Sequence, residues 1–350
     1  MPSGRVMRRC AVTVRVFDGH NDALSRLLRA GPDAAAGFLA GDGAGHLDLA
    51  RAERGGLAGG CFAVFTCSPR DADYDSRAYF ARVDRRRALR KALAQVALLL
   101  RLERGSGGRL RIVRSAADLD GDGLAAILHL EGAEPIGAGL EELEVLHAAG
   151  MRSLGLAWSR PNAFATGVPF EFPGSPDQGP GLSRAGRALV RACGELRILI
   201  DVSHLNARGF WEVAELSAAP LVASHSGAHV LCPSPRNLDD AQLRAIGESG
   251  GLAGINFHVG FLRGDGAEDA DTPLSAIAAH AAHVADLAGV DSVALGSDFD
   301  GATMPAALGD VGGLPALLDA LRAAGFGAQD VEKIAYGNWR RVLEATWGGA

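Results

Sequence analysis

Eight short apolar runs alternate with helical patterns along this 350-residue chain, and this alternation limits the folds open to it more than any other feature. The runs have β-type composition and are bounded by Gly, Asp or Pro. They lie at residues 12–17, 59–66, 124–130, 152–158, 197–203, 220–226, 252–257 and 292–298. Strands that alternate with helices form a parallel sheet, and eight parallel strands close a barrel. We therefore expect an α/β fold of the (β/α)8 TIM barrel type.

An open, doubly wound sheet would show the same alternation, but its dinucleotide-binding fingerprint GxGxxG is absent after the first run. A long helical pattern spans residues 73–104. Since the sequence shows no internal repeat and no low-complexity linker, we expect a single domain over residues 1–350. The Gly- and Pro-rich segment 160–182 is too long for a bare connection, so we expect a functional loop over the active site.

Composition argues against several classes of partner. A formal net charge of −6 leaves no broad basic surface for nucleic acid. The N-terminal segment lacks the apolar core of a secretory signal, and the apolar run at 92–100 is too short to span a membrane. Five cysteines without CxxC spacing predict buried thiols rather than disulfides or a zinc knuckle: Cys10, Cys61, Cys67, Cys193 and Cys232. We expect a cytoplasmic protein with neither nucleic-acid nor membrane partners.

Metal-ligand and carboxylate side chains close five of the eight runs. They are His20 and Asp22 at the end of the first strand, Glu131 at the end of the third, His204 at the end of the fifth, His225 at the end of the sixth and Asp298 at the end of the eighth. Each alone has a plainer interpretation, because a histidine at a strand end is often structural and Asp–Gly pairs are ordinary in turns. The carboxyl ends of barrel strands open on one face, so the joint pattern predicts a common pocket.

The other histidines fit structural positions better. His129, His147, His280 and His283 are assigned no site function, and His46 with Asp48 is typical of a helix start.

Three histidines and two carboxylates can hold two zinc-like ions with a shared ligand and open positions. The only lysines, Lys91 and Lys333, lie in helical patterns, so a carbamylated lysine is not expected to bridge the ions. Glu131 is then the natural bridge, and Asp298 is free to carry a proton. These residues predict a barrel of the metal-dependent hydrolase type.

Seven motifs, in order from about residue 16 to 343, resemble the membrane (renal) dipeptidase family of zinc peptidases. They are DGHND, EGAEPIG, DVSH, ASHSGAHVLCPSPRN, GINF, GSDFDG and YGNWRRV. The resemblance to this family, in its bacterial form, implies a (β/α)8 barrel with two Zn²⁺ per chain. It also implies a dipeptide substrate, often with a D-residue on the C-terminal side, and a homodimer.

The resemblance also assigns individual residues. His20 and Asp22 would bind one zinc, and His204 and His225 the other, with Glu131 bridging. Arg236, in the SPRN motif, would bind the substrate carboxylate, a task that suits a guanidinium. From the residues alone, Arg236 would be a surface loop residue.

Two candidate substrate-binding residues depart from the animal members of the family. Trp158 stands where those members have a histidine, and His258 where they have a tyrosine. Both positions bear on substrate preference and on polarisation of the substrate carbonyl.

The mechanism expected is attack by a hydroxide that bridges the metals, with Asp298 as the proton shuttle. Two alternatives stay open. The same barrel could act on another amide, a lactone or a phosphoester, or the chain could be a non-catalytic metal-binding homologue. Product analysis with a dipeptide panel, and the effect of metal removal, distinguish them.

Overall fold

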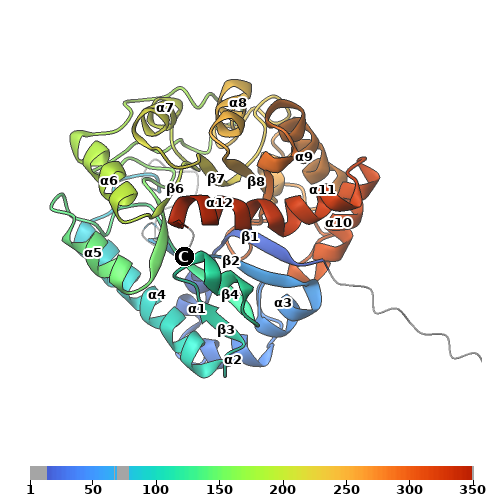
Figure 1. Cartoon of the computed structure of the whole chain (residues 1–350), viewed down its shortest axis with the longest axis horizontal. Helices are drawn as coiled ribbons and strands as arrows, with labels where there is room; N and C mark the ends of the chain where they lie inside the picture. Colours follow the sequence, from blue (N-terminus) through green and yellow to red (C-terminus); the bar gives the residue numbers. More distant parts are fainter. Residues whose placement is uncertain (1–13, 67, 69–78, 349–350) are drawn as a thin grey trace, which may run out of the picture.

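Eight parallel strands form a barrel in the computed structural model of the chain (Figure 1). The structure describes residues 14–66, 68 and 79–348. Neighbouring strands follow the order β1-β2-β4-β5-β6-β7-β8-β9. The strands are β1 (Val16–Asn21), β2 (Leu57–Phe65), β4 (Leu124–Glu131), β5 (Met151–Gly155), β6 (Leu199–Asp201), β7 (Val222–Ser226), β8 (Leu252–Asn256) and β9 (Val293–Gly296). The predicted (β/α)8 barrel is therefore confirmed.

The barrel closes between the first and last strands just beyond the end of β9. The backbone N–H of Asp298 donates to the carbonyl of His20 at 2.9 Å, and that of Asp22 donates to Phe299 at 2.7 Å. The Ser297 hydroxyl and N–H both donate to the Asp18 carboxylate, at 2.9 and 2.7 Å. These contacts place the polar tip of β1 beside the segment that follows β9.

The first strand begins later than the predicted range 12–17, of which residues 12 and 13 lie outside the described part of the chain. β1 runs on through the polar residues Asp18, His20 and Asn21, all of them buried. The apolar pattern ends before these residues because they are polar. Asp18 finds its hydrogen-bond donors inside the barrel, which allows the strand to continue.

Two further boundaries differ from the prediction. A short strand, β3 (Leu110–Ile112), was not predicted; it pairs with β4 off the main path of the sheet. The predicted helix 73–104 begins at Arg85, where the Asp84 carboxylate accepts a hydrogen bond from the N–H of Arg87. Residues 73–78 lie outside the described residues.

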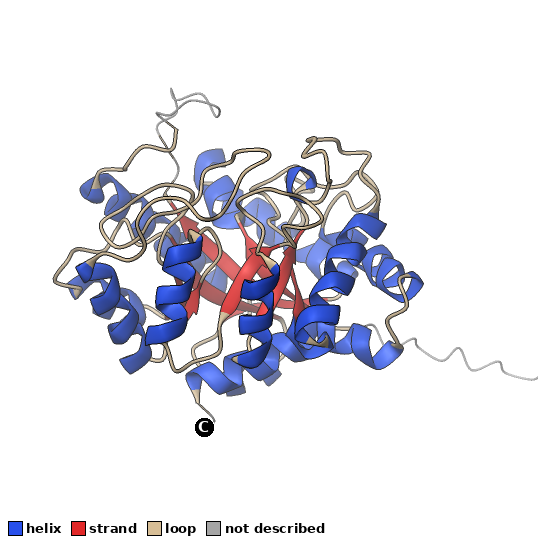
Figure 2. Ribbon diagram, turned by 90° about the horizontal axis from the view of Figure 1, so that it is seen from above, coloured by secondary structure: helices blue, strands red, loops and turns tan. Residues whose placement is uncertain are grey.

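Helices surround the strands, as Figures 1 and 2 show. They are α1 (Ala23–Ala30), α2 (Ala34–Ala40), α3 (Leu49–Gly55), α4 (Arg85–Gly105), α5 (Glu141–Ala148), α6 (Arg184–Glu195), α7 (Ala207–Leu216), α8 (Asp240–Glu248), α9 (Leu274–Ala288), α10 (Leu314–Ala323), α11 (Ala328–Glu332) and α12 (Asn338–Trp347). Long loops gather at one end of the barrel, and the C-terminal helix lies at the other (Figure 2).

Helix α12 covers the end of the barrel at which the strands begin. Its buried Trp339 and Trp347 belong to one apolar cluster with Leu199, Val222 and Leu252, which are the first residues of β6, β7 and β8. The indole N–H of Trp339 donates to the Leu295 carbonyl at 3.0 Å. Because this end is filled by apolar packing, the carboxyl ends of the strands are the end available for a site.

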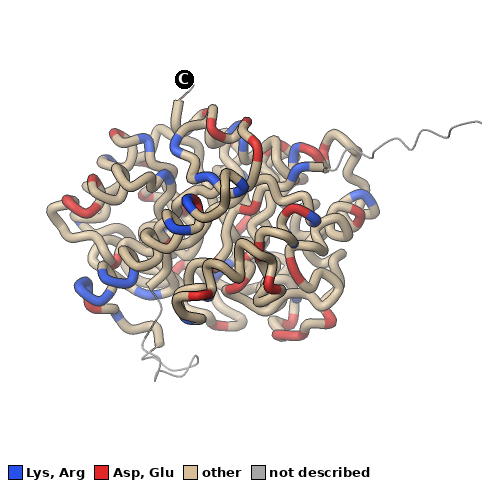
Figure 3. Tube along the Cα trace, turned by 90° about the horizontal axis from the view of Figure 1, so that it is seen from below, with Lys and Arg blue, Asp and Glu red and all other residues tan. Residues whose placement is uncertain are grey.

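The described cysteines match the sequence prediction. Cys61, Cys193 and Cys232 are buried free thiols, while Cys10 and Cys67 lie outside the described residues. Within the described ranges, no helix combines the length and apolar character needed to cross a membrane. Basic and acidic residues are interspersed along the trace (Figure 3).

Candidate active site

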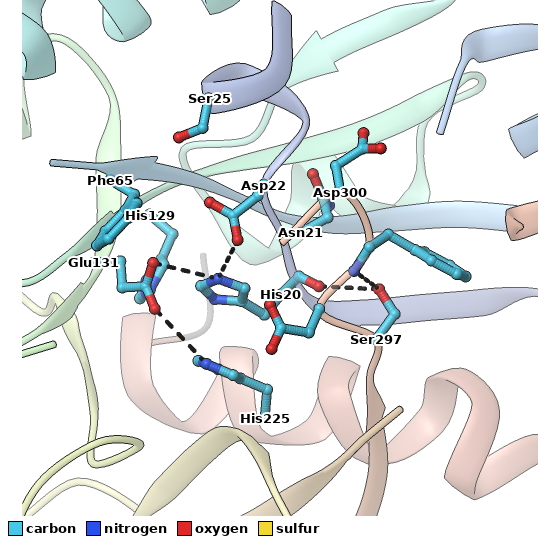
Figure 4. Close-up of polar contacts among 12 residues, drawn as sticks. His20, Asn21, Asp22, Ser25, Phe65, His129, Glu131, His225, Ser297 and Asp300 are labelled. Carbon is cyan, nitrogen blue, oxygen red and sulfur yellow. Dashed lines mark hydrogen bonds and ion pairs between the residues drawn. The ribbon is translucent and has the colours of Figure 1, made fainter. Parts of the chain in front are cut away.

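The five predicted metal ligands meet at the carboxyl end of the barrel, and Figure 4 shows four of them, His20, Asp22, Glu131 and His225. All five are buried: His20 lies in β1, Asp22 immediately before α1, Glu131 at the end of β4, His204 just after β6 and His225 in β7. The close-up in Figure 4 shows His20 and His225 pointing toward the Glu131 carboxylate. Residues from four strand ends are therefore neighbours in space.

Glu131 lies at the centre of this cluster. One carboxylate oxygen, Oε1, lies 3.0 Å from Nε2 of His204 and 3.7 Å from Nε2 of His225. The other, Oε2, lies 3.6 Å from Nε2 of His20, and that nitrogen is also 3.6 Å from Oδ2 of Asp22. Oε1 of Glu131 thus faces His204 and His225, whereas Oε2 faces His20.

The donor set fits divalent metal ions. The Nε2 atoms of His204 and His225 lie only 3.0 Å apart. Both ring nitrogens of His20 and Oδ1 of Asp22 are buried without a hydrogen-bond partner among the described residues. Buried polar atoms ordinarily find partners, and converging imidazoles and carboxylates are the ligands that zinc takes in catalytic sites. The cluster can therefore hold metal through these residues.

The protonation states of the cluster also favour the binding of a metal ion. Burial lowers the pKa values of His204 and His225 well below the usual value, and the positive charges of Arg236 and His20 lower them further, so both imidazoles are neutral. Burial raises the pKa of Glu131 to about 7. Burial opposes a proton on His20, but the negative charges of Glu131 and Asp22 outweigh burial and raise its pKa well above the usual value. The carboxylate half of the cluster thus attracts positive charge.

Asp298 lies beside the first pair of ligands. Ligand atoms of His20, Asp22 and Asp298 all lie within 4.8 Å of one another. The side-chain amide of Asn256, at the end of β8, donates to Oδ2 of Asp298 at 3.0 Å. Asp298 has a φ of 63°, and His204 a φ of 68°, a left-handed conformation that is costly for non-glycine residues and is common at functional sites.

A cavity of about 580 Å³ opens over the cluster. Its lining includes Asp22, Glu131, His204 and Asp298 from the cluster, so the predicted ligands face a space that a small molecule can enter.

Trp158 and neighbouring aromatic residues form one wall of the cavity. The Trp158 ring is stacked on Phe80, with ring centroids 5.8 Å apart and planes 7° apart, and lies 5.8 Å from the His204 ring. Phe170, from the predicted loop 160–182 between β5 and α6, meets Trp158 edge-on and also lines the cavity. Beneath the wall, the buried guanidinium of Arg160 lies 4.8 Å from the Trp158 ring and pairs with Glu134 at 2.8 Å.

His258 lines the cavity on another side. Its Nδ1 lies 3.3 Å from the carbonyl of Thr303, and its Nε2 lies 3.6 Å from the carboxylate of Glu268. The ring meets Phe261 at 88° with 4.6 Å between centroids. The imidazole is thus held by neighbours on three sides while facing the cavity.

Arg236 is buried rather than on the surface, in contrast to the interpretation from the residues alone. One guanidinium nitrogen donates to the carbonyl of His225 at 3.0 Å, and the group lies 5.6 Å from the centre of the Phe261 ring. Arg236 is not one of the residues that line the cavity, but it is close enough to lower the pKa values of His204 and His225.

Several contributors to the site were not predicted. Asn256 lies in the motif GINF, one residue before the end of the seventh apolar run, and this polar residue near a strand end was the signal that could have revealed it. Arg26 and Asp300, which form an ion pair at 2.8 Å, also line the cavity. Their pairing depends on barrel closure between β1 and β9, which no local pattern shows.

Of the histidines assigned to structural positions, His46 alone is among the described residues that line the cavity. His129 and His280 are buried; His129 hydrogen bonds with Ser153, and His280 with the backbone of Ala228 and Leu262. Asp48 does begin a helix, since its carboxylate accepts from the N–H of Arg51 at the start of α3.

Comparison with known proteins identifies the family. The model of the membrane dipeptidase family (peptidase family M19) matches residues 5–347. A crystal structure of a dipeptidase AC of family M19 is 48% identical, with a TM-score of 0.92, over 96% of this chain and 100% of that one. A metallo peptidase from Rhodobacter sphaeroides, liganded with a phosphinate mimic of L-Ala-D-Ala, is 47% identical, with a TM-score of 0.91 over the same shares.

A relative known from sequence is an uncharacterized protein in the pqqA 5' region of Klebsiella pneumoniae. It is 49% identical over 257 residues, which are 72% of this chain and 95% of the relative. The family match covers the barrel and every strand end that supplies the cluster. The chain therefore belongs to the membrane dipeptidase family, peptidase family M19, and is a metallo-dipeptidase.

Proposed function

We propose that this metallo-dipeptidase holds two zinc ions per chain and hydrolyses dipeptides, including L,D-dipeptides. The observation that carries the proposal is the position of Glu131, whose two oxygens lie within 3.0–3.7 Å of three histidine nitrogens. The relative from Rhodobacter sphaeroides, 47% identical, was crystallised with a mimic of L-Ala-D-Ala, which supports the inclusion of L,D-dipeptides among the substrates.

His20 and Asp22 would hold one ion, and His204 and His225 the other, with Glu131 between the two pairs. The 3.6 Å contacts of His20 Nε2 with Asp22 and Glu131, and the 3.0 Å contact of His204 Nε2 with Glu131, support this division. When bound, such ions supply Lewis acidity to the substrate carbonyl and lower the pKa of water.

Asp298 would carry the proton during hydrolysis. Water oxygen forms a bond to the peptide carbonyl carbon, the C–N bond breaks, and Asp298 transfers the proton released by the water to the leaving amine. The hydrogen bond from Asn256 to Oδ2 holds the carboxylate in one orientation and leaves Oδ1 for this transfer. The proximity of Asp298 to His20 and Asp22 supports this role.

Three residues would govern substrate binding. Arg236 would attract the C-terminal carboxylate, since its charge already acts on His204 and His225. Trp158 and His258 would contact the substrate side chains, because both line the cavity, and the loop 160–182 would cover the site through Phe170. A homodimer and a cytoplasmic location stay predictions from the sequence.

The proposal is tested with matched L,L- and L,D-dipeptides and with the C-terminal amide of each. We expect cleavage of both stereochemical series. The amides should lose about 10-fold to 100-fold in kcat/KM, because a hydrogen bond to a charged group contributes about 1.5–3 kcal/mol. Cleavage of amides as fast as acids would contradict the assignment of Arg236, and cleavage of no dipeptide would contradict the proposal itself.

A further inference from the structure

Behind the cluster, a buried serine links one of its histidines to a carboxylate that the proposed mechanism does not use. The hydroxyl oxygen of Ser224, in β7, lies 2.7 Å from Nδ1 of His225 and 2.5 Å from Oδ2 of Asp201. Asp201 ends the neighbouring strand β6, and all three residues are at least 98% buried. The three groups form a chain from carboxylate to hydroxyl to imidazole, shielded from water.

The carboxylate is itself fixed in place. Its other oxygen, Oδ1, accepts hydrogen bonds from the backbone N–H of Ser203 at 3.0 Å and of Ser224 at 2.8 Å. An ionised carboxylate can only accept hydrogen bonds. Oδ2 of Asp201 therefore presents a lone pair to the Ser224 hydroxyl from a position that two strands determine.

This order determines where the proton on the imidazole lies. A hydroxyl has one proton, and Ser224 donates it to Asp201. Toward His225 the same oxygen can then only accept, so Nδ1 of His225 must carry a hydrogen. In a neutral imidazole, a hydrogen on Nδ1 leaves the lone pair on Nε2. That nitrogen faces Glu131 at 3.7 Å and His204 at 3.0 Å, inside the cluster.

The second histidine of the pair lacks such a chain. Nδ1 of His204 lies 2.7 Å from the hydroxyl of Ser159, which is also buried. Among the described residues, however, no carboxylate hydrogen bonds with Ser159. Its hydroxyl can donate to His204 or accept from it, so the proton position on His204 is not determined in the same way. The two serines thus form a natural comparison within one site.

We propose that Asp201 and Ser224 are a positioning pair that holds His225 in the tautomer able to bind metal, and that they thereby set the zinc affinity of that half of the site. The inference rests on the proposed function, because it assigns His225 as a zinc ligand. Outer partners of this kind orient ligating histidines, and their removal typically weakens metal binding by about 10-fold to 100-fold.

The test measures zinc affinity directly, by competition with a chromophoric chelator, on metal-free full-length protein refilled with zinc. Ser224→Ala removes the link between Asp201 and His225. Its matched control is Ser226→Ala, on the same strand: Ser226 is equally buried, and its hydroxyl has no hydrogen-bond partner among the described residues. Both variants remove the same atom from a buried site.

We expect Ser224→Ala to weaken the binding of one of the two zinc ions by about 10-fold to 100-fold, whereas Ser226→Ala stays within about 2-fold of wild type. Ser159→Ala should lose less than Ser224→Ala. Asp201→Asn provides a second variant of nearly the same size: its amide can donate to Ser224, which frees the serine hydroxyl to donate to His225 and favours the wrong tautomer. It should also weaken one ion, and the midpoint of urea unfolding checks that each variant is folded.

Wild-type zinc affinity in folded Ser224→Ala and Asp201→Asn would overturn the inference while leaving the proposed function intact. Equal losses in Ser224→Ala and Ser226→Ala would overturn it as well, because the effect would then arise from the lost packing of a hydroxyl. A wild-type chain that binds no zinc would overturn the proposed function and, with it, this inference.

Discussion

The Glu131 carboxylate lies 3.0 Å from Nε2 of His204. Glu131 ends β4 and His204 follows β6, and these two strands are separated in the barrel by β5. The same carboxylate reaches His20 and His225 at 3.6 and 3.7 Å. A buried carboxylate is costly unless positive charge compensates it. A cation at this point offsets the cost, which is why Glu131 is central to the account of the site.

Replacement of Glu131 by Gln is expected to remove at least one zinc ion and to lower kcat/KM by about 1,000-fold or more, since a Lewis-acid ion supplies several kcal/mol. Elemental analysis and dipeptide cleavage check this expectation. Glu141→Gln, the same change at an exposed position in α5, should alter neither quantity. Full zinc content in Glu131→Gln would show that the carboxylate is not a ligand.

Asp298→Asn is expected to keep both zinc ions and to lower kcat by about 100-fold to 10,000-fold, the range typical for loss of a general acid–base group. The amide cannot carry the proton from water to the leaving amine. Zinc content and kcat measured on one preparation separate proton transfer from metal binding. If zinc is lost together with activity, Asp298 is a ligand, as its proximity to His20 and Asp22 would allow.

Zinc affinity is expected to fall as the pH decreases. Burial raises the pKa of Glu131 to about 7, and the neighbouring carboxylates raise that of His20, although burial opposes it. Near neutral pH, the metal-free protein therefore binds at least one proton at this pair of residues, and zinc must displace it. Affinity should decrease by about 10-fold or more per pH unit between about pH 8 and 6, for one or more protons released. Competition titrations across this range test the slope, and a flat profile would contradict it.

Asp18 is expected to make the folded chain less stable as the pH rises, whereas a salt-bridged carboxylate makes it more stable. Burial raises its pKa from 3.8 to about 6, against the hydrogen bonds from Ser297 and His20 that lower it. Between these values the folded chain binds more protons than the unfolded chain, so the contribution of Asp18 to stability decreases as the pH rises through this window. The decrease is about 3 kcal/mol.

The variant Asp18→Asn should lack this dependence. Urea unfolding of metal-free wild type and variant, at several pH values between about 4 and 7, measures the difference in the free energy of unfolding. The wild type should lose stability relative to the variant as the pH rises. Parallel curves for the two proteins would show that Asp18 ionises in the folded chain as easily as in the unfolded chain.

The barrel and the ligand cluster could be predicted because both are recorded locally in the sequence. Each strand is a short apolar run, and each ligand lies at or near the end of its run, so the pattern predicts that His20, Glu131 and His225 lie together. The short strand β3 (Leu110–Ile112) was missed because three residues give too little pattern. The end of β1 was misplaced because Asp18 is stabilised by Ser297, which is distant in sequence and follows β9.

Other parts of the site depend on contacts that no local pattern records. The aromatic contacts at the cavity join Phe80, from the connection between β2 and α4, to Trp158 and Phe170, both from the connection between β5 and α6. The burial of Arg236 depends on the packing of Phe261 and on a carbonyl of β7. Ser224 and Asp201 lie within the motifs that carried the resemblance, but their link requires β6 and β7 to be neighbours. Such features follow from the closed barrel and become visible only in three dimensions.

The most direct test of the two-zinc account is a titration of chelator-treated, metal-free protein with zinc, with dipeptide hydrolysis measured at each step. The account predicts no hydrolysis without metal and a rise in rate that levels off at about two zinc ions per chain. Hydrolysis that is complete at one zinc, or that persists without any, would contradict the assignment of His20, Asp22, Glu131, His204 and His225 to a two-zinc centre.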